Sequence, residues 1–144
     1  MHALYQGRLR PAPPNDAQHT PEQVQLIDAL PQAQLLEYLR SSLALLSAST
    51  EEGFDYPVLE AKAEGMPTLI SDIPVHREFH QDSSLFFPVD DDGGALADNV
   101  IACLQDHNLW TQLSQGGFAL AQRLSVAAQV ASIEDQFRQL CRTI

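Results

Sequence analysis

Short apolar runs alternate with helical patterns along the middle of the chain. Residues 43–47, 68–70 and 85–87 are apolar runs of strand length. Between the first two runs, Pro57 opens a helical segment that Gly65 closes. Proline is tolerated at a first helical position, and glycine is favoured just past a helix end. This alternation predicts a parallel sheet that is covered by helices on both faces.

The N-terminal stretch differs in composition from the rest of the chain. Four prolines lie among polar residues within residues 1–22, which predicts a loosely ordered arm. A short strand-like run follows at residues 24–28, and then leucines at helical spacing between Pro31 and Ser41. We therefore expect an arm over residues 1–22 and one domain over residues 23–144.

The C-terminal third has only helical patterns. Three helices are expected at about residues 94–107, 109–123 and 126–140, with Ser125 as the N-cap of the third. No internal repeat and no second domain are recognisable. The predicted fold class is α/β, a parallel sheet with flanking helices and a helical C-terminal tail.

Composition narrows the classes of function. The chain has 144 residues, a net charge of −11 and eight Lys and Arg residues, so nucleic acids and anionic membranes are disfavoured as partners. No apolar window approaches the roughly 18 residues of a transmembrane segment, and no signal peptide is recognisable. Cys103 and Cys141 have no metal-ligand spacing and are expected to be free thiols. These features favour a cytoplasmic location, with any inner-membrane association through partners.

Two loops at the carboxyl ends of strands hold the candidate chemistry, because ligands collect at this edge of an open parallel sheet. The first covers residues 49–56 and leads into the helix at Pro57, and the second covers residues 71–78. A helix N-terminus offers unpaired N–H groups and partial positive charge, which suit a phosphate. Gly53 would let the backbone approach such a ligand closely.

Glu52 in the first loop and Glu60 about one turn inside the helix are candidate sugar ligands. Carboxylates accept hydrogen bonds from sugar hydroxyls, so a phosphate at the helix end with hydroxyls on both glutamates would describe a sugar nucleotide. The spacing alone leaves an alternative open. In that alternative Glu52 only caps the helix and Glu60 is a solvated surface residue.

The stretch Ser-Thr-Glu-Glu-Gly-Phe-Asp-Tyr-Pro-Val-Leu-Glu-Ala, residues 49–61, resembles the hallmark of the group 1 (family 4) glycosyltransferases. That hallmark is a serine, two residues, and then Glu-Gly-Phe-Gly-x-Pro-x-Leu-Glu-Ala. The resemblance continues through residues 63–67 and 71–78 and extends from about Val24 to the C-terminus. Its most specific part is residues 49–78.

The resemblance implies the C-terminal, nucleotide-sugar-binding half of a GT-B fold, a Rossmann-like domain without its first βα unit here. Such enzymes transfer a sugar with retention of configuration and generally need no bound metal or other cofactor. They are used in bacterial polysaccharide and glycolipid assembly. The resemblance gives Glu52 the catalytic role of holding the donor sugar's hydroxyls, and it gives Glu60 the ribose hydroxyls. The implied donor-binding positions are Ser49, Gly53, Phe54, Asp55 and Glu60.

Three departures from the family pattern are apparent. Asp55 replaces a glycine; aspartate tolerates positive φ, but its charge is expected near the diphosphate and would repel it. The arginine and lysine that usually neutralise the diphosphate have no clear counterpart. Arg8 or Arg10 is a candidate substitute, with a solvated arm as the alternative. A full enzyme of this family also needs an N-terminal acceptor domain, which has no counterpart within these 144 residues, so we expect a fragment, a short protein that works with a partner, or a chain that has lost catalysis.

Two functions remain open. In the first, the chain binds a nucleotide sugar and works with a separate N-terminal acceptor domain. In the second, it is a catalytically inactive remnant that serves as a binding or assembly module, for example as a homodimer. No sugar transfer is expected from the chain alone.

Other polar and aromatic groups are assigned structural roles. His76 and His80 are four residues apart, but the HExxH pattern is not met, so a surface helix is expected rather than a metal site. The three aspartates at residues 90–92 fail the EF-hand spacing and are expected to favour the dipole of the next helix. The phenylalanines expected to pack in the core or the tail are Phe86, Phe87, Phe118 and Phe137.

Overall fold

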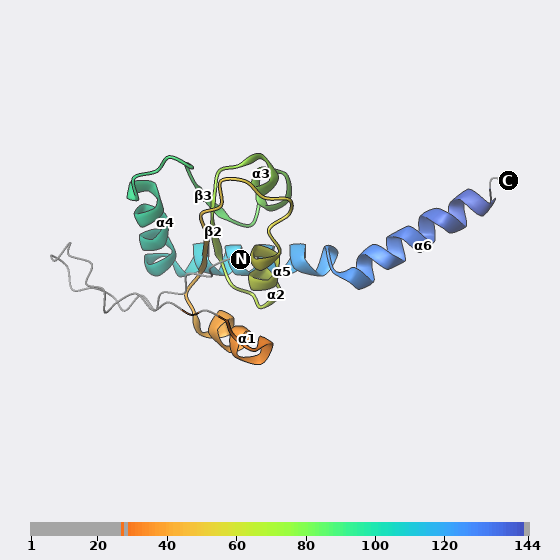
Figure 1. The fold of residues 1–144 in the computed structure, drawn as a ribbon, viewed down its shortest axis with the longest axis horizontal. Coiled ribbons are helices and arrows are strands. Elements are labelled where there is room, and N and C mark those ends of the chain that lie inside the picture. Colours follow the sequence, from red (N-terminus) through yellow and green to blue (C-terminus); the bar gives the residue numbers. More distant parts are fainter. Residues whose placement is uncertain (1–26, 28, 143–144) are drawn as a thin grey trace.

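The computed structural model describes residues 27 and 29–142. The arm expected over residues 1–22 lies outside the described residues, as does the run at residues 24–28 apart from Ile27. Three strands alternate with helices, and three further helices follow (Figure 1). In chain order the elements are α1 Gln32–Ser41, β1 Leu45–Ser47, α2 Tyr56–Ala63, β2 Thr68–Ser71, α3 Pro74–His80, β3 Leu85–Phe87, α4 Gly94–Gln105, α5 His107–Arg123 and α6 Val126–Arg142.

The strands form a parallel sheet in the order β1-β2-β3. Leu45 pairs with Thr68, and Ile70 pairs with Phe86. The α/β class and the parallel sheet predicted from the sequence are therefore confirmed.

The central strand β2 is buried at all of its positions because helices cover both faces of the sheet. Successive side chains of a strand point to opposite faces, so Leu69 and Ile70 enter different clusters. Ile70 belongs to a core cluster formed with α1, β1 and α2, and Leu69 belongs to one formed with α4 and α5. This arrangement explains why both central residues of the strand are apolar.

Helix α2 begins and ends where its sequence signals indicate. Pro57 lies in the first turn. At the other end Gly65 has a φ of 73°, its N–H donates to the Lys62 carbonyl, and the Met66 N–H donates to the Ala61 carbonyl. These two bonds make a Schellman motif, for which a residue without Cβ is favoured. The end of α2 at this glycine is thus confirmed.

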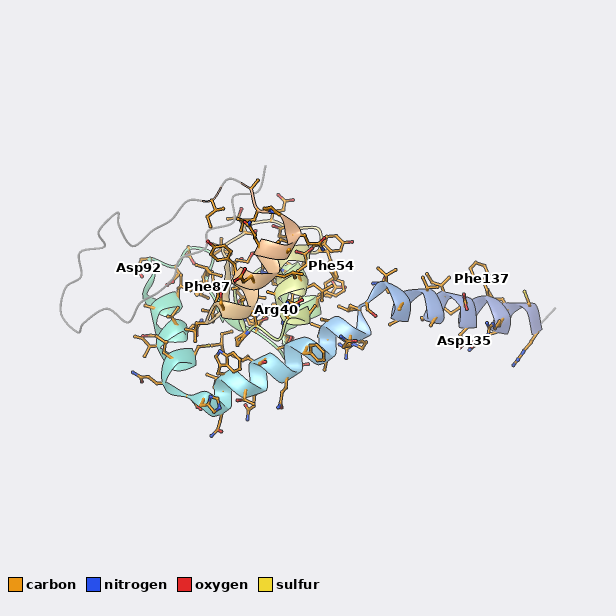
Figure 2. The ribbon with its side chains drawn as sticks, turned by 90° about the horizontal axis from the view of Figure 1, so that it is seen from below. Arg40, Phe54, Phe87, Asp92, Asp135 and Phe137 are labelled. Carbon is orange, nitrogen blue, oxygen red and sulfur yellow. The ribbon has the colours of Figure 1, made fainter. Side chains whose placement is uncertain are left out.

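The C-terminal helix α6 projects away from the sheet (Figure 1). The Ser125 hydroxyl accepts a bond from the Ala128 N–H, which confirms the predicted N-cap. The expected packing of two aromatic side chains is wrong, since Phe118 is 46% and Phe137 64% exposed. Figure 2 shows Phe137 projecting from α6, far from the sheet. The prediction depended on the apolar character of these side chains, but no described element covers them enough to bury them.

Across the part of the chain that the structure describes, no helix has both the length and the apolar character needed to cross a membrane.

Candidate functional site

The loop between β1 and α2, residues 48–55, and the connection between β2 and α3, residues 72–73, lie at the same edge of the sheet, because both follow parallel strands. A hydrogen bond joins the first segment to the end of β2: the Ser71 hydroxyl donates to the Ser49 carbonyl. We call the first of these segments the β1–α2 loop.

Glu52 is held by the serine that opens the sequence motif. The Ser49 hydroxyl donates to Glu52 Oε1 at 2.6 Å, and the Glu52 side chain is only half-buried. Glu52 does not cap α2, because the side chain that accepts from the start of this helix is Asp55. The alternative in which Glu52 only caps the helix is therefore wrong.

Asp55 is the N-cap of α2 and points into the protein. Its φ is 60°, the left-handed region that the family's glycine would adopt freely, and 5% of the residue is exposed. Oδ1 accepts from the Val58 N–H at 3.4 Å. Oδ2 accepts from the Ser47 hydroxyl at 2.6 Å and lies 3.0 Å from His76 Nε2. The carboxylate is turned inward toward three partners and does not point to the open side of the loop.

His76 lies beneath the β1–α2 loop and is completely buried. Its Nδ1 is 2.7 Å from the Ser71 carbonyl oxygen, opposite the contact with Asp55. The prediction that α3 presents both of its histidines on the surface is wrong. His76 and His80 face inward, whereas Arg77 and Glu78 are the exposed residues between them.

The pair of Asp55 and His76 is electrostatically coupled. Burial alone raises the pKa of the Asp55 carboxyl, but the hydrogen bonds from His76 and Ser47, with the charge of His76, bring that pKa below its usual value. Burial alone lowers the pKa of His76. The bonds to Asp55 and to the Ser71 carbonyl, with the negative charges of Asp55 and Glu52, raise it above its usual value. Both shifts favour the charged forms.

His80 differs from its neighbour. Both of its ring nitrogens are buried and have no hydrogen-bond partner within residues 27 and 29–142. Burial, together with the positive charges of Lys62 and His76, lowers the pKa of His80 to about 4, so the ring is neutral near pH 7. The Phe54 ring packs against Phe79 and His80, with centroid distances of 4.9 and 6.4 Å. Phe54 is half-buried, with its ring packed against α3.

The remaining predicted positions are open to solvent. Gly53 is exposed, and a Cβ built on it would meet nothing within 4 Å. The N–H groups of residues 53–56 make no hydrogen bond to another described residue. Glu60 is exposed on α2, and its carboxylate likewise has no described partner. The structure thus links Ser49 with Glu52, and it leaves Glu60 separate from them.

Acidic residues before α4 act as the sequence suggests. The Asp91 carboxylate accepts from the N–H groups of Ala95 and Leu96, and Asp92 accepts from that of Gly94. These bonds satisfy donors that a helix start leaves unpaired.

Ser47 was missed by the sequence reasoning as part of the site, and Ser71 and His76 were placed in the second candidate loop without a role beneath the first. The one available signal was the aspartate at a position where the family has glycine. A buried carboxylate requires hydrogen-bond donors, which Ser47 and His76 supply, and the Ser71 carbonyl lies against the opposite nitrogen of the His76 ring.

Known proteins resemble the chain in sequence and in structure. The sequence profile described as "Glycosyl transferases group 1" matches residues 16–119, more than half of the chain. The serotype-specific mannosyltransferase WbdA of Escherichia coli is 42% identical over 53 residues, which are 37% of this chain and 6% of WbdA. Sucrose-phosphate synthase from Thermosynechococcus elongatus superposes with a TM-score of 0.71 at 22% identity, over 86% of this chain and 32% of the synthase. The structural match shows that the fold is similar to part of a GT-B enzyme.

Proposed function

The chain belongs to the group 1 glycosyltransferases, and we propose that it is the donor-binding half of a retaining enzyme of this family. Its ligand in this proposal is a nucleoside-diphosphate sugar. The chain spans a small share of the relatives that it matches, 6% of WbdA and 32% of the synthase. Sugar transfer is accordingly proposed only together with an acceptor-binding domain.

The observation that carries the proposal is the β1–α2 loop. Its N–H groups over residues 53–56 are unpaired among the described residues and stand at the start of a helix, where partial positive charge favours a diphosphate. The open space at Gly53 admits a ligand against the backbone. The inward Asp55 carboxylate, paired with His76, removes the expected repulsion.

Two carboxylates near this anion site are proposed to bind hydroxyl groups. Glu52 takes the donor sugar, because the Ser49 bond fixes one of its oxygens and leaves the other free to accept. Glu60 takes the ribose, because its exposed carboxylate has no described partner to compete with a ligand. Since WbdA is named a mannosyltransferase, mannose is the first sugar to test.

Calorimetric titration with UDP, GDP and their sugar conjugates tests this assignment. We expect a micromolar Kd for one nucleoside diphosphate. Glu60→Gln should weaken it roughly 10- to 100-fold, the value of a hydrogen bond to a charged group. Glu52→Gln should leave the nucleoside diphosphate unaffected and weaken only the sugar conjugate. Glu51→Gln, which changes the adjacent exposed carboxylate, is the matched control and should change neither affinity.

No heat with any of these ligands would contradict the proposed function. Equal losses for Glu51→Gln and Glu52→Gln would contradict the specific role of Glu52, since both variants remove one charge from the same loop.

The second candidate function is a non-catalytic binding or assembly module. What favours it is the row of exposed apolar side chains on α6, which in a soluble monomer would remain in water. The row consists of Val126, Val130, Ile133, Phe137 and Leu140. Sedimentation at increasing concentration tests this candidate: a stable dimer that binds no nucleotide would favour it over the donor-binding role.

A further inference from the structure

Asp55 and His76 form a buried pair beneath the β1–α2 loop, and their hydrogen-bond partners determine which of the two is protonated. His76 Nδ1 lies 2.7 Å from the Ser71 carbonyl oxygen, which can only accept, so Nδ1 carries a proton. On the opposite side, Nε2 lies 3.0 Å from Asp55 Oδ2. The proton between Nε2 and Oδ2 resides on the ring or on the carboxyl group, and this choice fixes the charge of both residues.

The surroundings of Asp55 place that proton on the ring. Its Oδ2 already accepts from the Ser47 hydroxyl, and its Oδ1 accepts from the Val58 N–H, so both oxygens act as acceptors. An imidazole also holds a proton more tightly than a carboxylic acid, with ordinary pKa values of about 6.5 and about 3.9. His76 is then an imidazolium and Asp55 a carboxylate, and both are out of contact with water.

We propose that Asp55 and His76 are positioning residues for donor binding: a buried carboxylate–imidazolium pair that locks the β1–α2 loop onto the end of β2. This proposal rests on the proposed function, because it explains how that loop is prepared for a diphosphate. The pair itself touches no ligand. It acts through the backbone that Asp55 holds at a φ of 60° and through the residues bonded to the second side of His76.

A chain of hydrogen bonds leads from the pair to the proposed sugar ligand. His76 Nδ1 donates to the Ser71 carbonyl, and the Ser71 hydroxyl donates to the Ser49 carbonyl. The Ser49 hydroxyl in turn donates to Glu52 Oε1. Loss of the pair therefore changes both ends of the loop, the N–H groups before α2 and the carboxylate of Glu52.

The pair also decides what charge the loop presents. An aspartate at this position would repel a diphosphate, but the imidazolium neutralises it at 3.0 Å. The charged and titratable groups around His76 are Asp55 and Glu52 from the loop and His80 from α3, with Lys62 of α2 behind His80. The two carboxylates favour the charged ring, and His80 is its neutral neighbour.

Nitrogen NMR of the histidine rings in the full chain tests the charge of the pair without any ligand. We expect both ring nitrogens of His76 to be protonated at pH 6.5 and to remain so at pH values where an ordinary histidine is neutral. Histidine in a short unstructured peptide provides the reference. A His76 ring with a single protonated nitrogen at pH 6 overturns the proposal.

Three variants test the positioning role. Asp55→Gly keeps the left-handed backbone and leaves the imidazolium unpaired, His76→Leu leaves the carboxylate unpaired, and the double variant removes both charges. Each single change should shift the amide signals of residues 52–54 and weaken the Kd for UDP or GDP at least tenfold. The Kd of the double variant should rise by a smaller factor than the product of the factors for the two single variants. The control His107→Gln should change nothing.

Two readouts keep this proposal separable from the function on which it rests. If the unaltered chain binds no nucleoside diphosphate, the proposed function fails, and the amide signals of the loop still decide the positioning role. The positioning role is overturned if the single variants leave the amide signals of the loop unchanged. It is also overturned if the unaltered chain binds the nucleoside diphosphate and the single variants bind it with the same affinity. If His76→Leu does not fold, His76→Gln, which keeps a donor without the charge, replaces it.

Discussion

His76 and Lys62 are both completely buried bases, yet their surroundings differ. His76 faces the Asp55 carboxylate. Among the described residues, Lys62 Nζ donates only to neutral oxygens, the Ser83 carbonyl at 2.8 Å and the hydroxyls of Ser83 and Ser84 at 2.6 and 2.9 Å. The first base lies under the β1–α2 loop, and the second lies where α2 packs against α5.

The contrast shows that burial does not by itself decide the charge of a base. Burial lowers the pKa of Lys62 from 10.5 to about 7, because no carboxylate compensates the lost hydration. For His76 the same penalty is outweighed, and the pKa is raised above 6.5. Only the paired base is therefore charged at little cost, and it is the one beneath the proposed donor site.

The two bases affect stability with opposite dependence on pH. The stabilisation by His76 is complete below pH 6.5 and is lost as the pH rises through its raised folded-state pKa. The destabilisation by Lys62 is absent above pH 10.5, grows as the pH falls, and is complete below about pH 7. In the second case the unfolded chain binds the proton more tightly than the folded chain does.

The largest effect is expected from Asp55→Asn, which gives His76 the neutral surroundings of Lys62. Asparagine tolerates the left-handed backbone, so the change acts on charge. Leaving the imidazolium unpaired should lower the free energy of unfolding by about 3–5 kcal/mol at pH 6. The pKa of His76 should fall below its usual value. Urea unfolding and ring NMR measure the two quantities.

Asp90→Asn is the matched control, because Asp90 is exposed. Its effect on the free energy of unfolding should stay within about 0.5 kcal/mol. A loss of the same size in both variants would contradict the special role of the buried carboxylate.

A smaller effect of the opposite sign is expected from Lys62→Met. Methionine fills the space of the lysine stem and removes a buried charge whose partners are neutral. The free energy of unfolding should rise by about 1–4 kcal/mol at pH 6. The gain should shrink at pH 9, where the folded-state lysine with a pKa of about 7 is already neutral.

The difference in the free energy of unfolding between Lys62→Met and the unaltered chain, taken at each pH, isolates the contribution of the lysine from those of the other titrating groups. A gain that is the same at pH 6 and pH 9 would show that charge is not the cause. A loss at pH 6 would show that the three hydrogen bonds of Lys62 outweigh its desolvation.

Much of the fold was predictable because its signals are local. The short buried strand β2, the proline and glycine at the ends of α2, and the Ser125 cap each depend on a few neighbouring residues. The membership of Ser49 and Glu52 in one site was implied by the family pattern, and the geometry brings the two together.

The inward side of the site was not predictable, since it depends on contacts between distant residues. Whether Asp55 faces a ligand or the interior is decided by His76, which lies 21 positions away. The burial of His76 could not be predicted from its residue type, because a histidine is polar and is most often assigned to the surface or to a metal site. Conversely, Phe137 looks like a core residue, yet it is exposed because no described element covers α6.

The smallest effect concerns the stem of Lys62 rather than its charge. A Cβ on Gly117 of α5 would lie 2.9 Å from Lys62 Cγ, whereas one on Gly116 would meet no side-chain or backbone atom closer than 3.5 Å. Gly117→Ala should therefore lower the free energy of unfolding by about 1–3 kcal/mol through overpacking. Gly116→Ala should raise it by about 0.5–1 kcal/mol, because alanine favours the helix. Thermal unfolding of both variants, repeated with Lys62→Ala, checks the cause. If Gly117→Ala lowers the free energy of unfolding equally in the Lys62→Ala background, the contact between residues 62 and 117 is not the cause of the destabilisation.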